Sequence, residues 1–362
     1  MNNYAKIGSY SEEDVKFLLK DLSAIQLEGS TESREKRIQS GEHYSESLPV
    51  EYQPPAEYLE LYAATLNDYK TKVASHVANV AEQIFRLKGE KTILVSLARA
   101  GTPIGILIYR YLKWKYGISL PHYSVSIIRG RGLDMNAINY ILHHHPNGQI
   151  QFIDGWTGKG AISIELTKTC QEIQQKYGIE LDDTLAVLAD PGHCTTLFGT
   201  RDDFLIPSAC LNSTVSGLVS RTVLNNKYIG EHDFHGAKFY KELEPVDLSN
   251  EFLETITEQF PYVKYEFPHA TEKEASFSGM ETVKRIMDEF QIENINFVKP
   301  GVGETTRVLL RRVPWKILVR DFHSPYVKHI LMLCKEKNVE VQEYPNMDYT
   351  CCGLIKRVGE EG

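Results

Sequence analysis

Apolar residues recur at helical spacing through a long segment near the start of the chain. Between residues 56 and 87 they fall three or four positions apart, which is the pattern of one buried helix face: Leu59, Tyr62, Leu66, Val73, Val77, Val80 and Ile84. The 55 residues before this segment are more polar, and residues 11–20 predict one short helix there. A long amphipathic helix is therefore expected after a polar N-terminal extension.

Short apolar runs alternate with amphipathic stretches after the long helix. Strands are predicted at residues 92–97, 122–128, 149–154 and 184–189, and helices at residues 103–116, 135–144 and 160–177. This alternation predicts a parallel sheet with helices on both faces. Ligands of such sheets bind beyond the carboxyl ends of the strands, so the loops after Leu97, Ile128, Asp154 and Ala189 are the places to look for a site.

A second and smaller alternating unit lies near the end of the chain. It predicts helices at residues 279–290, 304–312 and 326–337, and strands at residues 295–298, 315–319 and 340–343. The expected organisation is an extension (1–55), a first domain (56–237), a linker with one amphipathic helix (238–261) and a small C-terminal domain (262–362). The fold class is thus α/β in both domains.

Composition agrees with two or three domains, because 362 residues with 42% apolar content can form sizeable cores. The six cysteines include no CxxC pair, so neither a disulfide framework nor a zinc ribbon is indicated. No apolar leader opens the chain and no run is long enough to cross a bilayer, so a cytoplasmic protein without a membrane partner is expected. The net charge of −8 argues against a nonspecific polyanion binder.

The sequence QIQFIDGWTGKGAIS, residues 149–163, has the form of a phosphate-binding loop. An apolar strand ends at Asp154, and a Thr157-Gly158-Lys159-Gly160 turn leads into a helix. Glycine amides approach an anion closely, and the positive end of the helix adds to the attraction. A tight strand-to-helix connection without a ligand is the plain alternative.

Two further loops carry cations at strand ends. Arg99, Ala100, Gly101 and Thr102 form a predicted second anion site facing the same crevice as the Gly158 loop. The loop with Arg129 and Arg131 is expected either to close over a ligand and stabilise pyrophosphate charge or to be a solvated loop. Asp190, at the end of the next strand, is a candidate general base.

These loops resemble those of the type I phosphoribosyltransferases. The resemblance implies a phosphoribosyltransferase-like sheet that binds phosphoribosyl pyrophosphate with Mg²⁺ and transfers the phosphoribosyl group to an unknown, base-like acceptor. It assigns the ribose and the metal to Asp154, the 5-phosphate to the Thr157–Gly160 turn, and pyrophosphate to Arg99, Ala100 and Gly101. The second acid that is usual in that family is Gly155 here.

Nearly the whole chain resembles a bacterial group found with tellurium-resistance and stress-response genes. The resemblance rests on REKRIQSGEHYSESLP, FIDGWTGKGAIS and DFLIPSACLNSTVSGLVSRTVLN. Members join such a domain to a Pelota-like RNA-binding domain and carry the name cysteine protease StiP. This implies an alternative function, proteolysis with Cys210 or Cys194 as the nucleophile and a histidine nearby. A buried, inert thiol is the plain alternative for each cysteine. A non-catalytic nucleotide sensor with an RNA adaptor domain is a further alternative.

The C-terminal segment FVKPGVGETTRVLLRR resembles Pelota and the kink-turn-binding ribosomal proteins. The resemblance implies binding of structured RNA, and the residues that would contact it are Lys299, Gly301, Gly303, Glu304, Arg307 and Arg311. A protein–protein or purely structural domain is the alternative. The sequence leaves open whether the chain forms a homo-oligomer.

Overall fold

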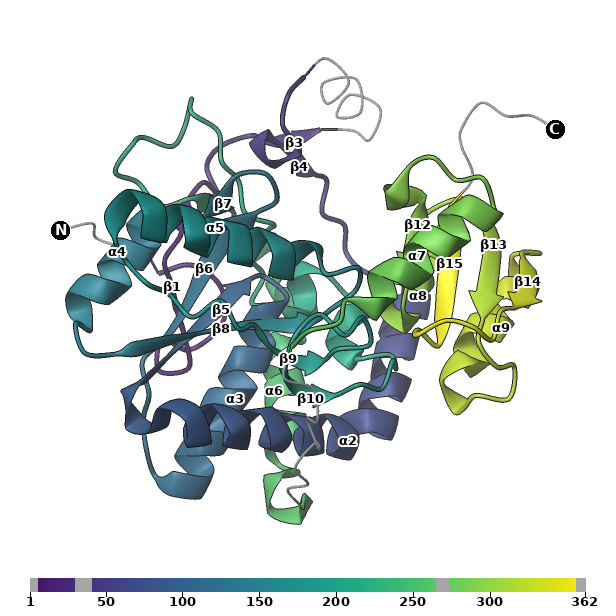
Figure 1. Cartoon of the computed structure of the whole chain (residues 1–362), viewed down its shortest axis with the longest axis horizontal. Coiled ribbons are helices and arrows are strands. Elements are labelled where there is room, and N and C mark those ends of the chain that lie inside the picture. Colours follow the sequence, from purple (N-terminus) through teal and green to yellow (C-terminus); the bar gives the residue numbers. More distant parts are fainter. Residues whose placement is uncertain (1–5, 30–40, 265–273, 356–362) are drawn as a thin grey trace.

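The computed structural model describes residues 6–29, 41–264 and 274–355. Two α/β parts lie side by side, the larger built around one sheet and the smaller formed by the last eighty or so described residues (Figure 1). The long predicted helix is confirmed as α2 (Ala56–Lys88). Its predicted apolar face is the buried one, with Val73, Val77 and Ile84 fully enclosed.

The larger sheet is mostly parallel, as the alternation of strands and helices predicts. Its strands in spatial order are β1 (Lys16–Phe17), β6 (His122–Ile128), β5 (Thr92–Ala98), β8 (Gln149–Trp156), β9 (Ala186–Ala189) and β10 (Leu197–Thr200). The short β7 (Gly132–Leu133) pairs antiparallel with β6. Because the strands run the same way, the loops after β5, β6, β8 and β9 gather at one edge of the sheet.

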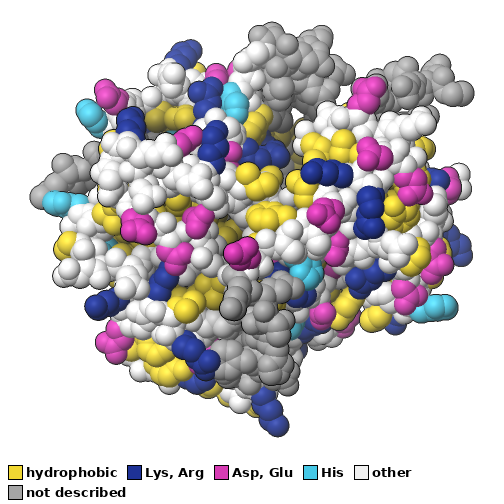
Figure 2. All heavy atoms as spheres, in the orientation of Figure 1, with side chains coloured by type: hydrophobic (Ala, Val, Ile, Leu, Met, Phe, Trp, Pro, Cys, Tyr) yellow, Lys and Arg dark blue, Asp and Glu magenta, His cyan; other side chains and the backbone are white. Residues whose placement is uncertain are grey.

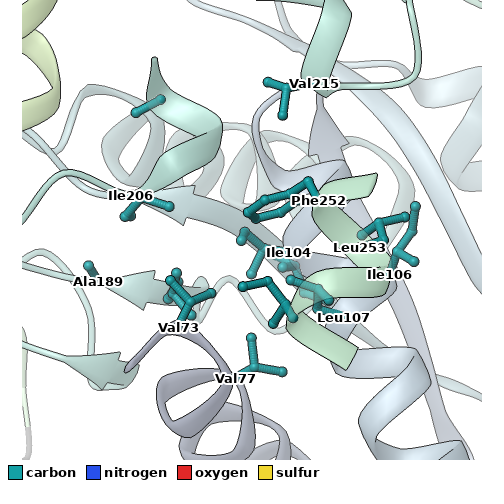
Figure 3. Close-up of a cluster of buried hydrophobic side chains, with 14 of the residues drawn as sticks. Val73, Val77, Ile104, Ile106, Leu107, Ala189, Ile206, Val215, Phe252 and Leu253 are labelled. Carbon is teal, nitrogen blue, oxygen red and sulfur yellow. The ribbon is translucent and has the colours of Figure 1, made fainter. Parts of the chain in front are cut away.

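Helices cover both faces of this sheet, and each face has its own apolar core. On one face lie α2, α3 (Gly101–Tyr116) and α6 (Ser249–Thr257), and on the other α4 (Met135–His144) and α5 (Ala161–Tyr177) (Figure 1). Side chains from α2, α3 and α6 meet in one cluster that includes Val73, Leu107 and Phe252 (Figure 3). The segment expected to be a linker therefore contributes α6 to the core of the first domain.

Two parts of the larger domain differ from the sequence expectations. The helix predicted at residues 11–20 is wrong, because the segment contains β1 and β2 (Lys20–Asp21) instead. Val15 and Phe17 are buried while Lys16 is exposed, which is strand alternation, and β1 pairs with β6 at the sheet edge. Strand β10 was not predicted from its four residues.

Two pairs of short strands flank the larger sheet. Strand β2 pairs with β11 (Gly236–Ala237), which joins the N-terminal residues to the segment that follows β10. Strand β3 (Glu28–Gly29) pairs with β4 (Leu48–Pro49) within the N-terminal residues. Within the residues that the structure describes, no helix is long and apolar enough to cross a membrane.

The C-terminal domain has a four-stranded mixed sheet and three helices. The strand order is β12 (Val298–Pro300), β15 (Cys351–Ile355), β13 (Pro314–Val319) and β14 (Glu340–Glu343), and the helices are α7 (Ser278–Glu289), α8 (Val302–Arg311) and α9 (Lys328–Glu336). All three predicted helices and the strands β13 and β14 are confirmed, with shifted ends. The strand predicted at residues 295–298 is wrong, because Ile295–Phe297 form a short 3-10 helix and β12 begins at Val298. The central strand β15 was missed, because five residues with a glycine in the middle show no clear alternation.

Candidate functional site

Residues 157–160 connect β8 to α5, and β8 continues two residues beyond Asp154, the predicted strand end, to Trp156. Gly160 caps α5 with φ +80°, a conformation that glycine adopts without strain, and no side chain caps this helix end. The Asp154 carboxylate accepts a 2.7 Å hydrogen bond from the amide of Gly155. Burial raises the pKa of the Asp154 carboxyl to about 7, since that one hydrogen bond offsets only part of the desolvation.

A cavity of about 240 Å³, the interdomain cavity, opens beside this segment. Both domains line it: Arg129, Asp154, Trp156, Thr157, Gly158, Lys159, Gly160, Ala161, Ile162, Ser163 and Leu185 from the first, and Asn296, Lys299, Pro300 and Glu304 from the second. Figure 2 shows Lys and Arg side chains in the groove where the larger and smaller lobes meet. The predicted phosphate loop therefore faces a cationic space that the C-terminal domain completes.

Lys159 links the two domains across this cavity. Its ammonium donates to the carbonyl oxygens of Ile295 (2.6 Å) and Val298 (3.1 Å) in the C-terminal domain. Burial, together with the nearby positive charges of Lys299 and Arg129, lowers the pKa of Lys159 to about 8. Part of its hydrogen-bonding capacity is thus used in holding the domains together.

The Arg99 loop does not face the interdomain cavity. Arg99 and Ala100 line a separate cavity of about 30 Å³, which shares Trp156 as a wall. The Arg99 guanidinium donates to the carbonyl of Val219 at 3.1 Å. Thr102 is fully buried and lies 2.8 Å from the hydroxyl of Ser124, so it belongs to the core. The expected pair of anion loops over one crevice is not formed.

The two arginines of the loop after β6 lie in different surroundings. Arg129 is exposed, lines the interdomain cavity and lies over the ring of Tyr44 at 5.5 Å. Arg131 pairs with Glu46 at 3.6 Å, outside that cavity. Only Arg129 therefore remains a candidate ligand contact.

Asp190, the predicted general base, is surrounded by hydrogen-bond donors. It is fully buried and pairs with Arg201, and it accepts hydrogen bonds from the Thr157 hydroxyl and from the amides of Cys194 (2.8 Å) and Thr195 (3.1 Å). A carboxylate has enough acceptor sites for all of these donors. The role of Asp190 as a general base stays a prediction.

The six cysteines are free and buried, and their surroundings separate one from the rest. Five belong to the apolar core clusters: Cys170, Cys210, Cys334, Cys351 and Cys352. Burial raises the pKa of the Cys210 thiol to about 12, and its carbonyl accepts from Arg311 at 3.1 Å. Cys194 alone lies outside these clusters, at the carboxyl edge of the parallel sheet.

The Cys194 thiol lies against the start of α5. A Cβ built on Gly160 would come 3.0 Å from its Sγ, and the thiol's acceptors are the carbonyls of Gly192 (3.3 Å) and Gly158 (3.7 Å). A helix N-terminus favours a thiolate. Burial is the larger effect here, however, and raises the pKa of Cys194 to about 11. Neither acceptor is a histidine, so the thiol keeps its proton in this arrangement.

The C-terminal domain covers the loop that carries Cys194. The amides of Phe277 and Gly279 donate to the carbonyls of His193 (2.9 Å) and Gly192 (3.3 Å). The Tyr349 hydroxyl donates to the carbonyl of Gly158 at 3.0 Å, the same oxygen that the Cys194 thiol approaches. Access to this thiol therefore requires movement of the C-terminal domain.

The residues predicted to contact RNA lie at the same interface. Asp203 of the first domain accepts from the first helical amide of α8, at Val302 (2.9 Å), and from the amide of Thr350 (2.7 Å). Arg307 donates to the carbonyl of Ala209 and pairs with Glu304, while Arg311 donates to Asn212 and Cys210. Gly301 and Gly303 lie against Asp203 and Ala209. Of the four candidates with a side chain, Glu304, Arg307 and Arg311 are hydrogen-bonded or ion-paired. Lys299 makes no hydrogen bond or ion pair from its side chain to a described residue.

Comparison with known proteins identifies both parts of the chain. A family model described as "Tellurite-like stress resistance cysteine protease StiP" matches residues 8–257. A protein of Acinetobacter baylyi named "Cysteine protease StiP" is 33% identical over an alignment 369 residues long, which spans 98% of this chain and 95% of that protein. The chain belongs to the StiP family. A second model, "PELOTA RNA binding domain", matches residues 277–357.

Membership of the StiP family corrects the main functional prediction. The match is to a family described as a cysteine protease, so the predicted phosphoribosyltransferase activity is wrong, and so is a magnesium-dependent phosphoribosyl transfer as its chemistry. The loop motif does not specify the ligand, because a glycine turn at a helix start can bind many anions. These include the oxyanion that forms during acyl transfer. In the described residues no group of three or more His, Cys, Asp or Glu side chains could hold a metal ion, and Mg²⁺ at Asp154 stays a prediction.

Sequence reasoning missed several residues that build the site. Ser163, one helical turn into α5, lines the interdomain cavity. Asp203 joins the domains, and Arg201 neutralises Asp190. The run Arg201-Asp202-Asp203 directly after a buried strand end was the available signal, since adjacent charges at the carboxyl edge of a parallel sheet seldom serve the core alone.

Proposed function

We propose that this protein is a cysteine protease whose nucleophile is Cys194. Membership of the StiP family supports the reaction class. One observation supports the residue: Cys194 is the single cysteine outside the apolar cores, and it lies at the carboxyl edge of the sheet against a helix N-terminus. Cys210, the other candidate, is packed inside the core beneath Arg311.

The surroundings of Cys194 fit acyl transfer. Attack of the Cys194 thiolate on a peptide carbonyl forms a tetrahedral oxyanion, and the amides at the uncapped start of α5 are donors that would stabilise it. Collapse of that intermediate releases the amine and leaves a thioester, which water hydrolyses. Asp190 acts as a positioning residue, because it holds the amide of Cys194 and the hydroxyl of Thr157.

We propose further that the arrangement described above is a latent one. The thiol is protonated at neutral pH and its loop is covered by Phe277, Gly279 and Tyr349. Displacing the C-terminal domain would let water reach the thiol and lower its pKa toward its ordinary value. His193, whose backbone has φ +55°, adjoins the nucleophile and is the nearest candidate in sequence for a proton acceptor once the loop is released.

The C-terminal domain is proposed to bind structured RNA. The match to the Pelota RNA-binding domain supports this, and Lys299, Glu304, Arg307 and Arg311 provide charged contacts of the right kind. Since Arg307 and Arg311 are bonded to the first domain, RNA that used them would compete with the docking of α8.

At the level of fold, we propose a type I phosphoribosyltransferase-like arrangement for the first domain, without that activity. The parallel order β6, β5, β8, β9 with a glycine turn after β8 supports it. The same fold can host unrelated reactions. A cytoplasmic location is also proposed, because six free thiols suit a reducing compartment.

The test of the reaction class is hydrolysis of casein and of short peptides by the full-length protein. We expect hydrolysis that iodoacetamide abolishes and that chelators leave unchanged. The variant Asp203→Ala, which removes the acceptors for Val302 and Thr350, should loosen the covering domain and raise the rate at least about fivefold. Absence of hydrolysis by both proteins, or hydrolysis that survives alkylation, would overturn the proposal.

A further inference from the structure

We propose that the interdomain cavity binds a small phosphorylated molecule, which bridges the two domains and holds them in the docked arrangement. The first domain supplies the start of α5 and Ser163, and the second supplies Lys299. The site shares the start of α5 with the proposed protease site, but its side chains, Ser163 and Lys299, are not part of the protease proposal, so their variants test binding separately. The proposal assigns a site that would be complete only when both domains are in contact.

In the first domain, the Ser163 hydroxyl is the side-chain donor that we assign to the ligand. The Ser163 side chain is 6% exposed and lines the cavity, and its hydroxyl has no hydrogen-bond partner among the described residues. An unpaired buried hydroxyl costs free energy, so such groups usually have a partner in the functional state. Ser163 is the third residue of α5, a helix of 17 residues whose first amides have no side-chain cap. Hydroxyl and amides together provide donors for one anion.

In the C-terminal domain, the Lys299 ammonium is the cation that we assign to the ligand. It is partly buried, lines the same cavity and makes no hydrogen bond or ion pair with any residue that the structure describes. Burial lowers the pKa of Lys299, and the positive charges of Arg129 and Arg312 act in the same direction, against Glu304. Glu304 is itself paired with Arg307 at 3.0 Å. The cations Arg129, Lys159 and Lys299 therefore exceed the negative charge around the cavity.

The geometry favours a phosphate over a carboxylate. A carboxylate is planar and is best matched by an arginine fork, whereas the cavity offers amides, a hydroxyl and ammonium groups from several directions. Such a set fits the oxygens of a tetrahedral phosphate. The volume of about 240 Å³ lies just below the range of ordinary ligand pockets, which suits a small molecule.

The direct test is isothermal titration of the full-length protein with inorganic phosphate and with pyrophosphate. We expect saturable binding that Lys299→Met weakens at least about tenfold and Ser163→Ala about fivefold, since each change removes one donor to the anion. The matched control is Lys316→Met, a lysine of the same domain that pairs with Glu340 and lies away from the cavity; its affinity should stay within about twofold of wild type. Equal binding by all four proteins would overturn the proposal.

The bridging role has its own readout. The amides of Val302 and Thr350 donate to Asp203 across the interface, so their hydrogen exchange reports on docking. Pyrophosphate at about ten times the wild-type Kd should slow this exchange at least about fivefold in wild type and no more than about twofold in Lys299→Met. Binding without slower exchange would contradict the bridging role. If instead a short RNA displaced phosphate and lost its own affinity in Ser163→Ala, the cavity would be an RNA site and the proposal wrong.

Discussion

Replacing Cys194 by alanine should lower kcat/KM for peptide hydrolysis at least about a thousandfold, while replacing Cys210 should leave it within about threefold. The reason is that Cys194 alone among the six thiols lies beside polar groups that can assist acyl transfer: the start of α5 and the Asp190-anchored loop. Cys210 is packed in an apolar cluster, where a thiol acts as a small hydrophobic group. Kinetics on purified full-length variants measures the difference.

The control for this comparison is the folded state of each variant. Cys210→Ala leaves a small gap in a core and is expected to cost about 1 kcal/mol of stability. Cys194→Ser keeps the shape of the nucleophile and removes most of its reactivity, so it should lose activity without losing stability. If Cys210→Ala abolished hydrolysis in a well-folded protein while Cys194→Ala retained it, the assignment of the nucleophile would be reversed.

Replacing Asp190 by alanine should lower the free energy of unfolding by about 3–5 kcal/mol, because it removes the buried carboxylate that pairs with the partly exposed Arg201 and accepts from two buried amides. Asp190 is fully buried, pairs with Arg201 and accepts from the amides of Cys194 and Thr195. Its removal strands these donors in the interior. Urea unfolding, followed by circular dichroism, measures the loss.

The matched control for Asp190 is Asp202→Ala. Asp202 also pairs with a cation, Lys72 at 2.5 Å, but its side chain is half exposed. Solvent screens such a pair, and its loss should cost no more than about 1 kcal/mol. Similar losses for both variants would show that Asp190 does not hold the Cys194 loop together. A well-folded Asp190→Ala with full peptidase activity would exclude its positioning role.

The regular elements of the first domain could be predicted because their signals are local. The face of α2 repeats over nine turns, and β6 and α4 have the bounds that their apolar patterns indicate. Strand β15 could not be found this way, because a short central strand is defined by its neighbours β12 and β13. Its place in the sheet depends on contacts far apart in the sequence.

The site could be located from the sequence, but the roles of its residues could not be fully assigned. Asp154 and the Gly158 turn face a cavity as expected, since their positions follow from a strand end and a helix start. Arg99 and Thr102 also follow a strand end, yet their side chains lie away from that cavity. Arg99 donates to the carbonyl of Val219 and Thr102 contacts the hydroxyl of Ser124, and both partners are distant in sequence. That the C-terminal domain covers Cys194 is a property of the interface, and no local pattern encodes it.

The central claim is that Cys194 forms the covalent intermediate, and mapping that adduct tests it most directly. The full-length protein and Asp203→Ala are incubated with a peptide that carries a thiol-reactive electrophile at its scissile position, and the modified residue is located by peptide mass spectrometry. We expect one adduct, on Cys194, that forms faster in Asp203→Ala and is absent from Cys194→Ala. An adduct on Cys210 or another residue, with Cys194 unmodified while peptide hydrolysis is blocked, would contradict it.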